Sequence, residues 1–152
     1  MEIAMFQPDI AGNVGTTLRT AACFGVLAHI IEPCGFPFSD GALKRAGMDY
    51  ATRANVRRHA DWDGFFEWSA DAGRRVVLLT TAGATPLPAF EFAWGDILLL
   101  GAESSGVPPH VHDAAAARVA IPMRSGFRSL NVAVAAGIAL AEALRQTKGF
   151  PE

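Results

Sequence analysis

Short hydrophobic runs alternate along this chain with longer segments in which apolar and polar residues are mixed. An uninterrupted apolar run of a few residues is typical of a strand that is buried on both faces of a parallel sheet. We predict such strands at residues 75–80, 97–100 and, as a shorter run, 118–121, and two further strands at 3–6 and 27–31. Their alternation with helical segments predicts an α/β fold, a mostly parallel sheet flanked by helices.

Capping residues and glycines indicate where the helices begin and end. We predict helices at 14–24, from Ser39 or Asp40 to Met48, at 61–72, after Pro108 and at 129–146. Asn13 is suited to cap the first of these, while Gly25 and Gly73 are suited to end the first and third. The last helix is apolar almost all round until Glu142. A helix without a solvated face is buried in its own core or against a partner.

The composition describes one globular unit. Hydrophobic residues make up 51% and charged residues 18% of the 152 residues, which excludes a disordered or fibrous chain. The sequence contains no internal repeat, low-complexity tract or linker. We therefore expect residues 1–152 to form a single domain.

The charge is uneven although its sum is small. A formal net charge of -2 gives no global positive field that would attract a nucleic acid. Locally, however, five cations lie between residues 44 and 58, where only Asp49 opposes them: Lys44, Arg45, Arg53, Arg57 and Arg58. Taken alone, this cationic cluster is more often a solvated face than a binding surface.

Several compartments and chemistries are disfavoured. The first residues lack the basic start and long apolar stretch of a signal peptide, and the uncharged run at 129–141 falls short of the roughly 20 residues that span a bilayer. Cys23 and Cys34 make neither a disulfide framework nor a metal site by themselves. No Cys-x-x-Cys or His-Glu-x-x-His spacing occurs. We expect a cytoplasmic protein that needs neither a metal nor a membrane.

The loops that follow strands are where a binding site is expected, because ligands of open parallel sheets bind beyond the carboxyl ends of the strands. Three such loops contain candidate residues, at 7–15, 101–108 and 122–131. Gly101 and Gly106 have the spacing of a phosphate loop, but no Lys-Ser or Lys-Thr follows them, so a nucleoside triphosphate site is poorly supported. A simple tight turn explains these glycines equally well.

A hydrolase is a second possibility that the residues do not support. Ser104, Ser105, His110 and His112 lie close together in the sequence. No Gly-x-Ser-x-Gly motif is present, however, and no acid is obviously placed to orient a histidine. We expect both histidines on the surface of the helix after Pro108.

The three loops become specific when they are taken together. They contain, in this order, Asn13-x-x-x-x-x-Arg19, Gly101-x-Glu103-x-x-Gly106-x-Pro108, and Ile121-Pro122-Met123 leading to Ser129-Leu130-Asn131. This series resembles the three motifs of the knotted SpoU-type RNA ribose methyltransferases and spans nearly the whole chain. The length, with segments 31–36 and 43–50, narrows the resemblance to the minimal TrmL-like branch, which methylates the 2′-hydroxyl of nucleotide 34 in the tRNA anticodon loop.

The resemblance implies a fold, a cofactor and partners. The fold is α/β with a C-terminal trefoil knot, and the protein is a homodimer in which the long apolar helix finds its partner surface. The methyl donor is S-adenosylmethionine, and the residues expected to line its pocket are Leu79, Gly101, Ile121, Met123, Ser129 and Leu130. Several of these would equally suit the core. Because the donor sulfonium loses its charge in the transition state, we expect no cation against the sulfur.

The family pattern also assigns catalytic roles, to Arg19, Asn13, Glu103, Ser129 and Asn131. Arg19 is the residue expected to activate the ribose. A guanidinium has a pKa above about 12, so we favour electrostatic stabilisation of a phosphate or developing alkoxide over a general base.

The other catalytic assignments have structural alternatives. Asn13 would orient Arg19 or simply cap its helix, and Glu103 would steer Arg19 or the cofactor. Ser129 and Asn131 would donate hydrogen bonds near the cofactor and ribose, or cap the helix that follows. Arg19 and the cationic cluster would bind phosphates of the anticodon stem-loop, contacts that position an RNA without reading its sequence.

Two positions depart from the TrmL-like pattern. Ser104 or Ser105 stands where that branch usually has arginine, and Ala133-Val134 stands where it favours Ser-Asn. The residues after Asn131 are closer to the broader SpoU/TrmH group. Two alternatives therefore stay open: methylation of another tRNA or ribosomal RNA ribose, and a catalytically silent RNA-binding dimer.

Overall fold

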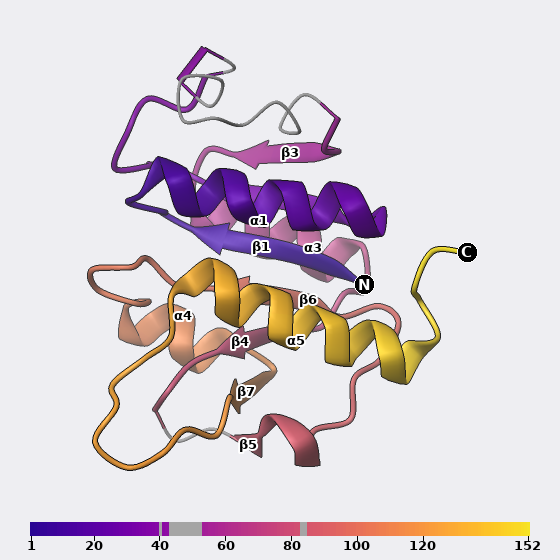
Figure 1. Ribbon diagram of the computed structural model, residues 1–152. Coiled ribbons are helices and arrows are strands. Elements are labelled where there is room, and N and C mark those ends of the chain that lie inside the picture. Colours follow the sequence, from indigo (N-terminus) through magenta and orange to yellow (C-terminus); the bar gives the residue numbers. More distant parts are fainter. Residues whose placement is uncertain (40, 43–52, 83–84) are drawn as a thin grey trace.

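The computed structural model describes residues 1–39, 41–42, 53–82 and 85–152 (Figure 1). Its elements are, in chain order, β1 (Glu2–Phe6), α1 (Ala11–Phe24), β2 (Leu27–Ile31), β3 (Val56–His59), α3 (Trp62–Asp71), β4 (Val76–Leu79), β5 (Thr85–Pro86), the 3-10 helix η2 (Leu87–Ala89), β6 (Ile97–Leu100), α4 (Pro109–Ala114), β7 (Ala117–Ala120) and α5 (Val132–Thr147). The five predicted strands are β1, β2, β4, β6 and β7, each within one residue of its predicted ends.

The strands form one seven-stranded sheet in the order β3-β2-β1-β6-β4-β7-β5. Every pairing within it is parallel, which confirms the predicted α/β class. The central strands β1 and β6 are buried along their whole length, as their apolar runs at 3–6 and 97–100 require. The carboxyl ends of β4, β6 and β7 therefore lie together at one edge of the sheet.

Helices cover both faces of the sheet. Figure 1 shows α1 and α5 in front of the sheet, with α3 and α4 behind it. The front core contains Leu18 of α1 and Leu140 of α5, both completely buried. The rear core contains Phe65 of α3 and Val111 of α4, also completely buried. No helix of the described residues is long and apolar enough to cross a membrane.

The helix ends correct two predictions. α1 begins at Ala11 with Ile10 at its N-cap, so the prediction that Asn13 caps this helix is wrong. Its predicted stop is confirmed, because Gly25 adopts the left-handed conformation at φ 66°. α5 begins at Val132 and not at Ser129, and Asn131 alone is its N-cap, with its side chain accepting from the backbone of Ala133 and Val134.

Other outcomes depend on shorter segments. The helix predicted after Pro108 is α4, and His110 is exposed on it while His112 is half-buried. The strands β3 and β5 were not predicted. The helix predicted from Ser39 or Asp40 to Met48 lies mostly outside the described residues, although Ser39 Oγ accepts a capping-type hydrogen bond from the Ala42 amide at 3.1 Å. The strand pairings do not test the C-terminal knot, which stays a prediction.

Candidate active site

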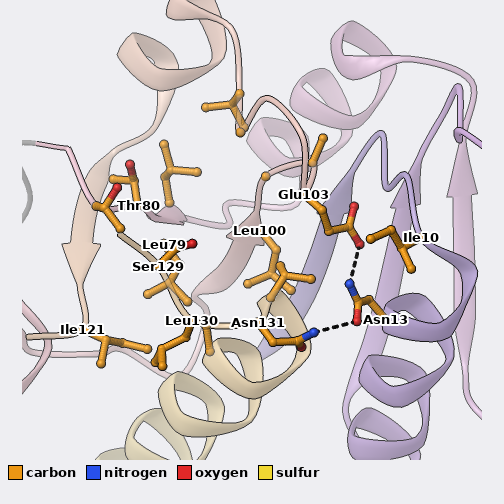
Figure 2. A pocket seen from close by; sticks show the side chains of 18 of the residues that line it. Ile10, Asn13, Leu79, Thr80, Leu100, Glu103, Ile121, Ser129, Leu130 and Asn131 are labelled. Carbon is orange, nitrogen blue, oxygen red and sulfur yellow. Dashed lines mark hydrogen bonds between the residues drawn. The ribbon is translucent and has the colours of Figure 1, made fainter. Parts of the chain in front are cut away.

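A cavity of about 530 Å³ lies at the carboxyl ends of β4, β6 and β7, bordered by the first turns of α1 and α5 (Figure 2). Its volume is in the range of sites that hold a small molecule or cofactor. Its lining comprises Ile10, Asn13, Leu78, Leu79, Thr80, Thr81, Leu100, Gly101, Ala102, Glu103, Gly106, Val107, Ile121, Met123, Ser129, Leu130, Asn131, Val132 and Ala135. The three motif-bearing loops thus meet at one place, as the strand-end rule requires.

All six residues predicted for the cofactor pocket line this cavity: Leu79, Gly101, Ile121, Met123, Ser129 and Leu130. Of the residues predicted to be catalytic, Asn13, Glu103, Ser129 and Asn131 line it as well. Figure 2 shows that Asn13, Glu103 and Asn131 come from segments far apart in the sequence. The cavity is therefore the place where the predicted cofactor and catalytic residues come together.

Sequence reasoning missed the loop after β4. Thr80 and Thr81 line the cavity, and the backbone amide of Thr80 donates to the Val119 carbonyl at 2.9 Å, which fixes this loop against β7. The signal was available, because β4 ends at Leu79 and the same strand-end rule points to the residues that follow it.

A chain of hydrogen bonds joins the three motifs. Nδ2 of Asn131 donates to Oδ1 of Asn13 at 3.0 Å, and Nδ2 of Asn13 donates to Oε1 of Glu103 at 3.2 Å (Figure 2). The other carboxylate oxygen of Glu103 accepts from the backbone amide of Asp9 at 2.7 Å. An ionised carboxylate only accepts hydrogen bonds, so it sets the orientation of the Asn13 amide and thereby that of Asn131.

The second motif forms a tight turn, one of the two structures expected for Gly101 and Gly106. Ala102 and Gly106 exchange backbone hydrogen bonds of 2.9 and 2.8 Å, and Gly106 has φ 65°. A Cβ atom on Gly101 would lie 2.7 Å from the carbonyl carbon of Gly106, so only glycine fits there. The turn also presents Gly101 and Glu103 to the cavity, so the structural and functional explanations both apply.

Ser104 fastens this turn to the loop after β1. Its backbone amide and its hydroxyl both donate to Oδ2 of Asp9, at 3.0 and 2.5 Å. These hydrogen bonds, the hydroxyl one first, lower the pKa of Asp9 below its ordinary value. Ser104, one of the two serines that stand where the TrmL-like pattern usually has an arginine, therefore fastens the second motif to the loop after β1.

The cavity offers no positive charge to its ligand. Among the described residues that line it there is no lysine, arginine or histidine, and Glu103 is the single carboxylate. Apolar side chains and backbone groups of this kind suit a cationic sulfonium whose charge disappears during the reaction. Within the described part of the chain, no group of three His, Cys, Asp or Glu side chains is arranged to hold a metal ion.

Arg19 lies apart from the cavity. It is exposed on α1 and is not among the lining residues. Arg19 comes six positions after Asn13, so the two side chains point about 120° apart around the helix axis. Asn13 is hydrogen-bonded to Glu103 and to Asn131, and Glu103 also accepts from the Asp9 amide. Their predicted roles in orienting Arg19 stay predictions.

The cationic cluster is also separate from the cavity, since none of its described members lines it. Arg58 pairs with Glu32, and this hydrogen bond raises the pKa of the guanidinium. The guanidinium of Arg57 lies 4.7 Å from the centre of the Trp68 ring. Arg53 is exposed, whereas Lys44 and Arg45 lie outside the described residues.

Known proteins resemble the chain over nearly its whole length. The model of the SpoU rRNA Methylase family matches residues 1–141. A tRNA (cytidine(34)-2'-O)-methyltransferase of Ancylobacter novellus is 53% identical over 99% of this chain and 95% of its own length.

Solved structures of RNA methyltransferases also resemble this chain. One that concerns the 2-OH methylation of C/U34 on tRNA has a TM-score of 0.88 and 41% identity, covering 95% of this chain and 94% of the other. An AdoMet-bound rRNA methyltransferase of Sinorhizobium meliloti has a TM-score of 0.85 and 32% identity over 95% of this chain and 55% of its own. With its motifs gathered at one cavity and these similarities along its length, the chain belongs to the SpoU rRNA Methylase family.

Proposed function

We propose that this protein transfers a methyl group from S-adenosylmethionine to the ribose 2′-oxygen of nucleotide 34 in the tRNA anticodon loop. The observation that carries the proposal is the convergence of three distant motifs on one cavity, where Asn13, Glu103 and Asn131 form a continuous hydrogen-bonded chain. Support for the substrate comes from the names of the relatives, which act at C34 or C/U34 of tRNA.

S-adenosylmethionine supplies a methyl group bound to a positively charged sulfur. The residues suited to hold it are Leu79, Gly101, Ile121, Met123, Ser129 and Leu130, which line the cavity without a cation. The carboxylate of Glu103 adds a negative charge on one side of the cavity and fixes Asn13 by a hydrogen bond. Arg19 stabilises the negative charge that develops on the ribose oxygen or binds its neighbouring phosphate.

We further propose that one cytoplasmic domain, residues 1–152, works as a homodimer with the C-terminal knot of its family. α5 supports the dimer, because Val134 and Ile138 lie four residues apart on the same side of this helix and are 52% and 41% exposed. The opposite side of α5 is buried against the sheet through Ala136 and Leu140. A second copy would cover the exposed apolar side chains.

The test is methyl transfer from labelled S-adenosylmethionine to total tRNA, followed by nucleoside analysis and mapping. We expect a 2′-O-methyl group at nucleotide 34. Arg19→Ala should abolish transfer and leave cofactor binding nearly unchanged, because Arg19 does not line the cavity. A loss of cofactor affinity in that variant would contradict the assigned role.

A different target ribose is the second candidate. One observation favours it: the second motif has Ser104 and Ser105, of which Ser104 is held by Asp9, where the TrmL-like pattern usually has an arginine at one of the two positions. Transfer to ribosomal RNA or to another tRNA position in the same assay would establish this candidate. Cofactor binding without transfer to any RNA would instead indicate a catalytically silent RNA-binding dimer.

A further inference from the structure

The loop between β7 and α5 has its two ends in the cavity and its middle outside it. Met123 lies near its start and Ser129 and Leu130 near its end, and all three line the cavity. Between them, Gly126 turns the chain at φ 95° and the amide of Phe127 donates to the Arg124 carbonyl at 3.4 Å. Figure 1 shows this loop in orange, projecting beyond the carboxyl ends of the strands. We name residues 122–130 the tip loop.

Phe127 is the most exposed large apolar side chain of the described residues, at 73%. It is not isolated along the chain, since Leu130, three residues later, is 39% exposed and lines the cavity. Ile10, across the cavity on the α1 side, is 50% exposed. Exposed apolar side chains therefore line this cavity and extend beyond it along the tip loop.

Phe127 has one arginine on each side of it in the sequence. Arg124 and Arg128 are both exposed, and within the described residues neither guanidinium has a hydrogen bond or an ion pair. No aspartate or glutamate occurs between Asp113 and Glu142. The tip loop thus combines an exposed aromatic ring with two uncompensated positive charges.

This combination of an aromatic ring and two arginines fits single-stranded RNA. Unpaired bases of RNA loops stack on aromatic side chains, and arginines bind the phosphates on either side. Protein–protein interfaces are also enriched in phenylalanine and arginine, so the composition alone does not select RNA, and the position of the tip loop beside the cavity does. Because both ends of the tip loop line the cavity, its middle lies next to any nucleotide whose ribose reaches the cofactor.

We propose that Phe127 stacks on an unpaired base beside the methylated nucleotide, and that Arg124 and Arg128 bind the flanking phosphates. The inference rests on the proposed function, because it presumes that an RNA loop enters the cavity. The tip loop would thus be a second RNA-binding surface, separate from the cationic cluster and next to the cavity.

Four substitutions of Phe127 test the stacking. Tyrosine and tryptophan keep an aromatic face, leucine keeps the apolar bulk without a ring, and alanine removes both. The probe is an unmodified anticodon stem-loop, for which Kd is measured without cofactor turnover and KM and kcat in the transfer assay. We expect Phe127→Leu and Phe127→Ala to raise Kd and KM roughly 5- to 100-fold, the worth of one base–aromatic stack. Phe127→Tyr and Phe127→Trp should bind like the wild type.

The arginines are tested through salt dependence. Arg124→Ala and Arg128→Ala should each reduce the slope of log Kd against log salt concentration by about 0.7. Arg145→Ala is the matched control, because this exposed arginine pairs with Glu142 near the other end of α5 and should leave the slope unchanged. Unaltered slopes in both tip-loop variants would overturn the assignment of phosphate contacts.

Two results would overturn the stacking itself. Phe127→Leu with wild-type RNA affinity would show that no ring is needed. A change of oligomeric state in Phe127→Ala, measured by analytical ultracentrifugation, would assign the ring to contact with a second copy. A wild-type chain that binds the stem-loop but transfers no methyl group would defeat the proposed function. The Kd values of the Phe127 variants would still test the stacking, because RNA binding is measured without turnover.

Discussion

Nδ2 of Asn131 donates a hydrogen bond to Oδ1 of Asn13, a residue 118 positions earlier in the chain. The same Asn131 side chain caps α5, since its Oδ1 accepts from the amides of Ala133 and Val134. One residue thus begins a helix and ties it to the first turn of another. The geometry of the cavity depends on this tie, because both residues line it.

Replacing Asn131 with aspartate separates these two roles. Aspartate caps a helix as well as asparagine does, but its carboxylate cannot donate to Asn13. We expect Asn131→Asp to unfold at nearly the wild-type temperature while its single-turnover rate falls about 5-fold, the worth of one hydrogen bond of ~1 kcal/mol. Asn131→Ala should lose about 1 kcal/mol of stability in addition. Full activity in the aspartate variant would show that the tie to Asn13 is dispensable.

The direction of the hydrogen bond between Asn13 and Glu103 can be reversed by substitution. Glu103 accepts from both the Asp9 amide and Asn13, and Glu103→Gln leaves one of these donors facing an NH₂ group. We expect this variant to lose about 1–3 kcal/mol of unfolding free energy, measured by urea titration.

A second substitution should restore the pattern. In Glu103→Gln with Asn13→Asp, the glutamine donates to a carboxylate that also accepts from Asn131. The double variant should therefore be more stable than Glu103→Gln alone. Strict additivity of the two single effects in the double-mutant cycle would contradict the direct contact between the two side chains.

Two glycines provide a matched pair of alanine substitutions. A Cβ on Gly101 would meet backbone atoms of Gly106 at 2.7 to 3.0 Å, whereas a Cβ on Gly12 in α1 has nothing within 4 Å. Gly101→Ala should therefore open the turn of the second motif and weaken S-adenosylmethionine binding, measured by calorimetry. Gly12→Ala should stabilise the protein by about 0.5–1 kcal/mol, since alanine favours the helix. Equal cofactor affinity in both variants would contradict the role of the tight turn.

A buried histidine pair predicts how stability depends on pH. Nδ1 of His29 lies 3.0 Å from Nε2 of His59, and Nε2 of His29 lies 2.9 Å from a carboxylate oxygen of Glu2. Burial, followed by the charges of His29 and Arg57, lowers the pKa of His59 to about 4. Burial also lowers the pKa of His29, against the opposing effect of Glu2.

Because the unfolded chain binds protons near the ordinary histidine pKa of about 6.5, it takes up more protons than the folded protein below that pH. The stabilising effect of the neutral pair is complete above pH 6.5 and is lost as the pH falls toward about 4. Urea unfolding between pH 7 and 4 measures this slope. His59→Gln removes one titrating group and should flatten it, and an unchanged slope would assign the acid sensitivity to other groups.

The sequence by itself determined what depends on neighbouring residues. The apolar run at 97–100 located β6 to the residue, because a strand covered on both faces favours apolar residues at every position, and the predicted bounds of β2 were also correct although it contains the buried His29. Gly25 marked the end of α1, since a left-handed residue is required there. The resemblance of the three motifs to a known family also implied which residues line the cavity.

Only the tertiary structure decided what depends on distant pairings. β3 carries the exposed Arg57 and Arg58, and as an edge strand it has no apolar run by which to recognise it. Asn13 was expected to cap a helix, but its partners are Glu103 and Asn131, which are 90 and 118 positions away. The neighbouring residues do not reveal whether such a side chain will bond to its own helix or to a distant residue. For Asn13, the packing of α1 and α5 on one face of the sheet decided that its partners are distant.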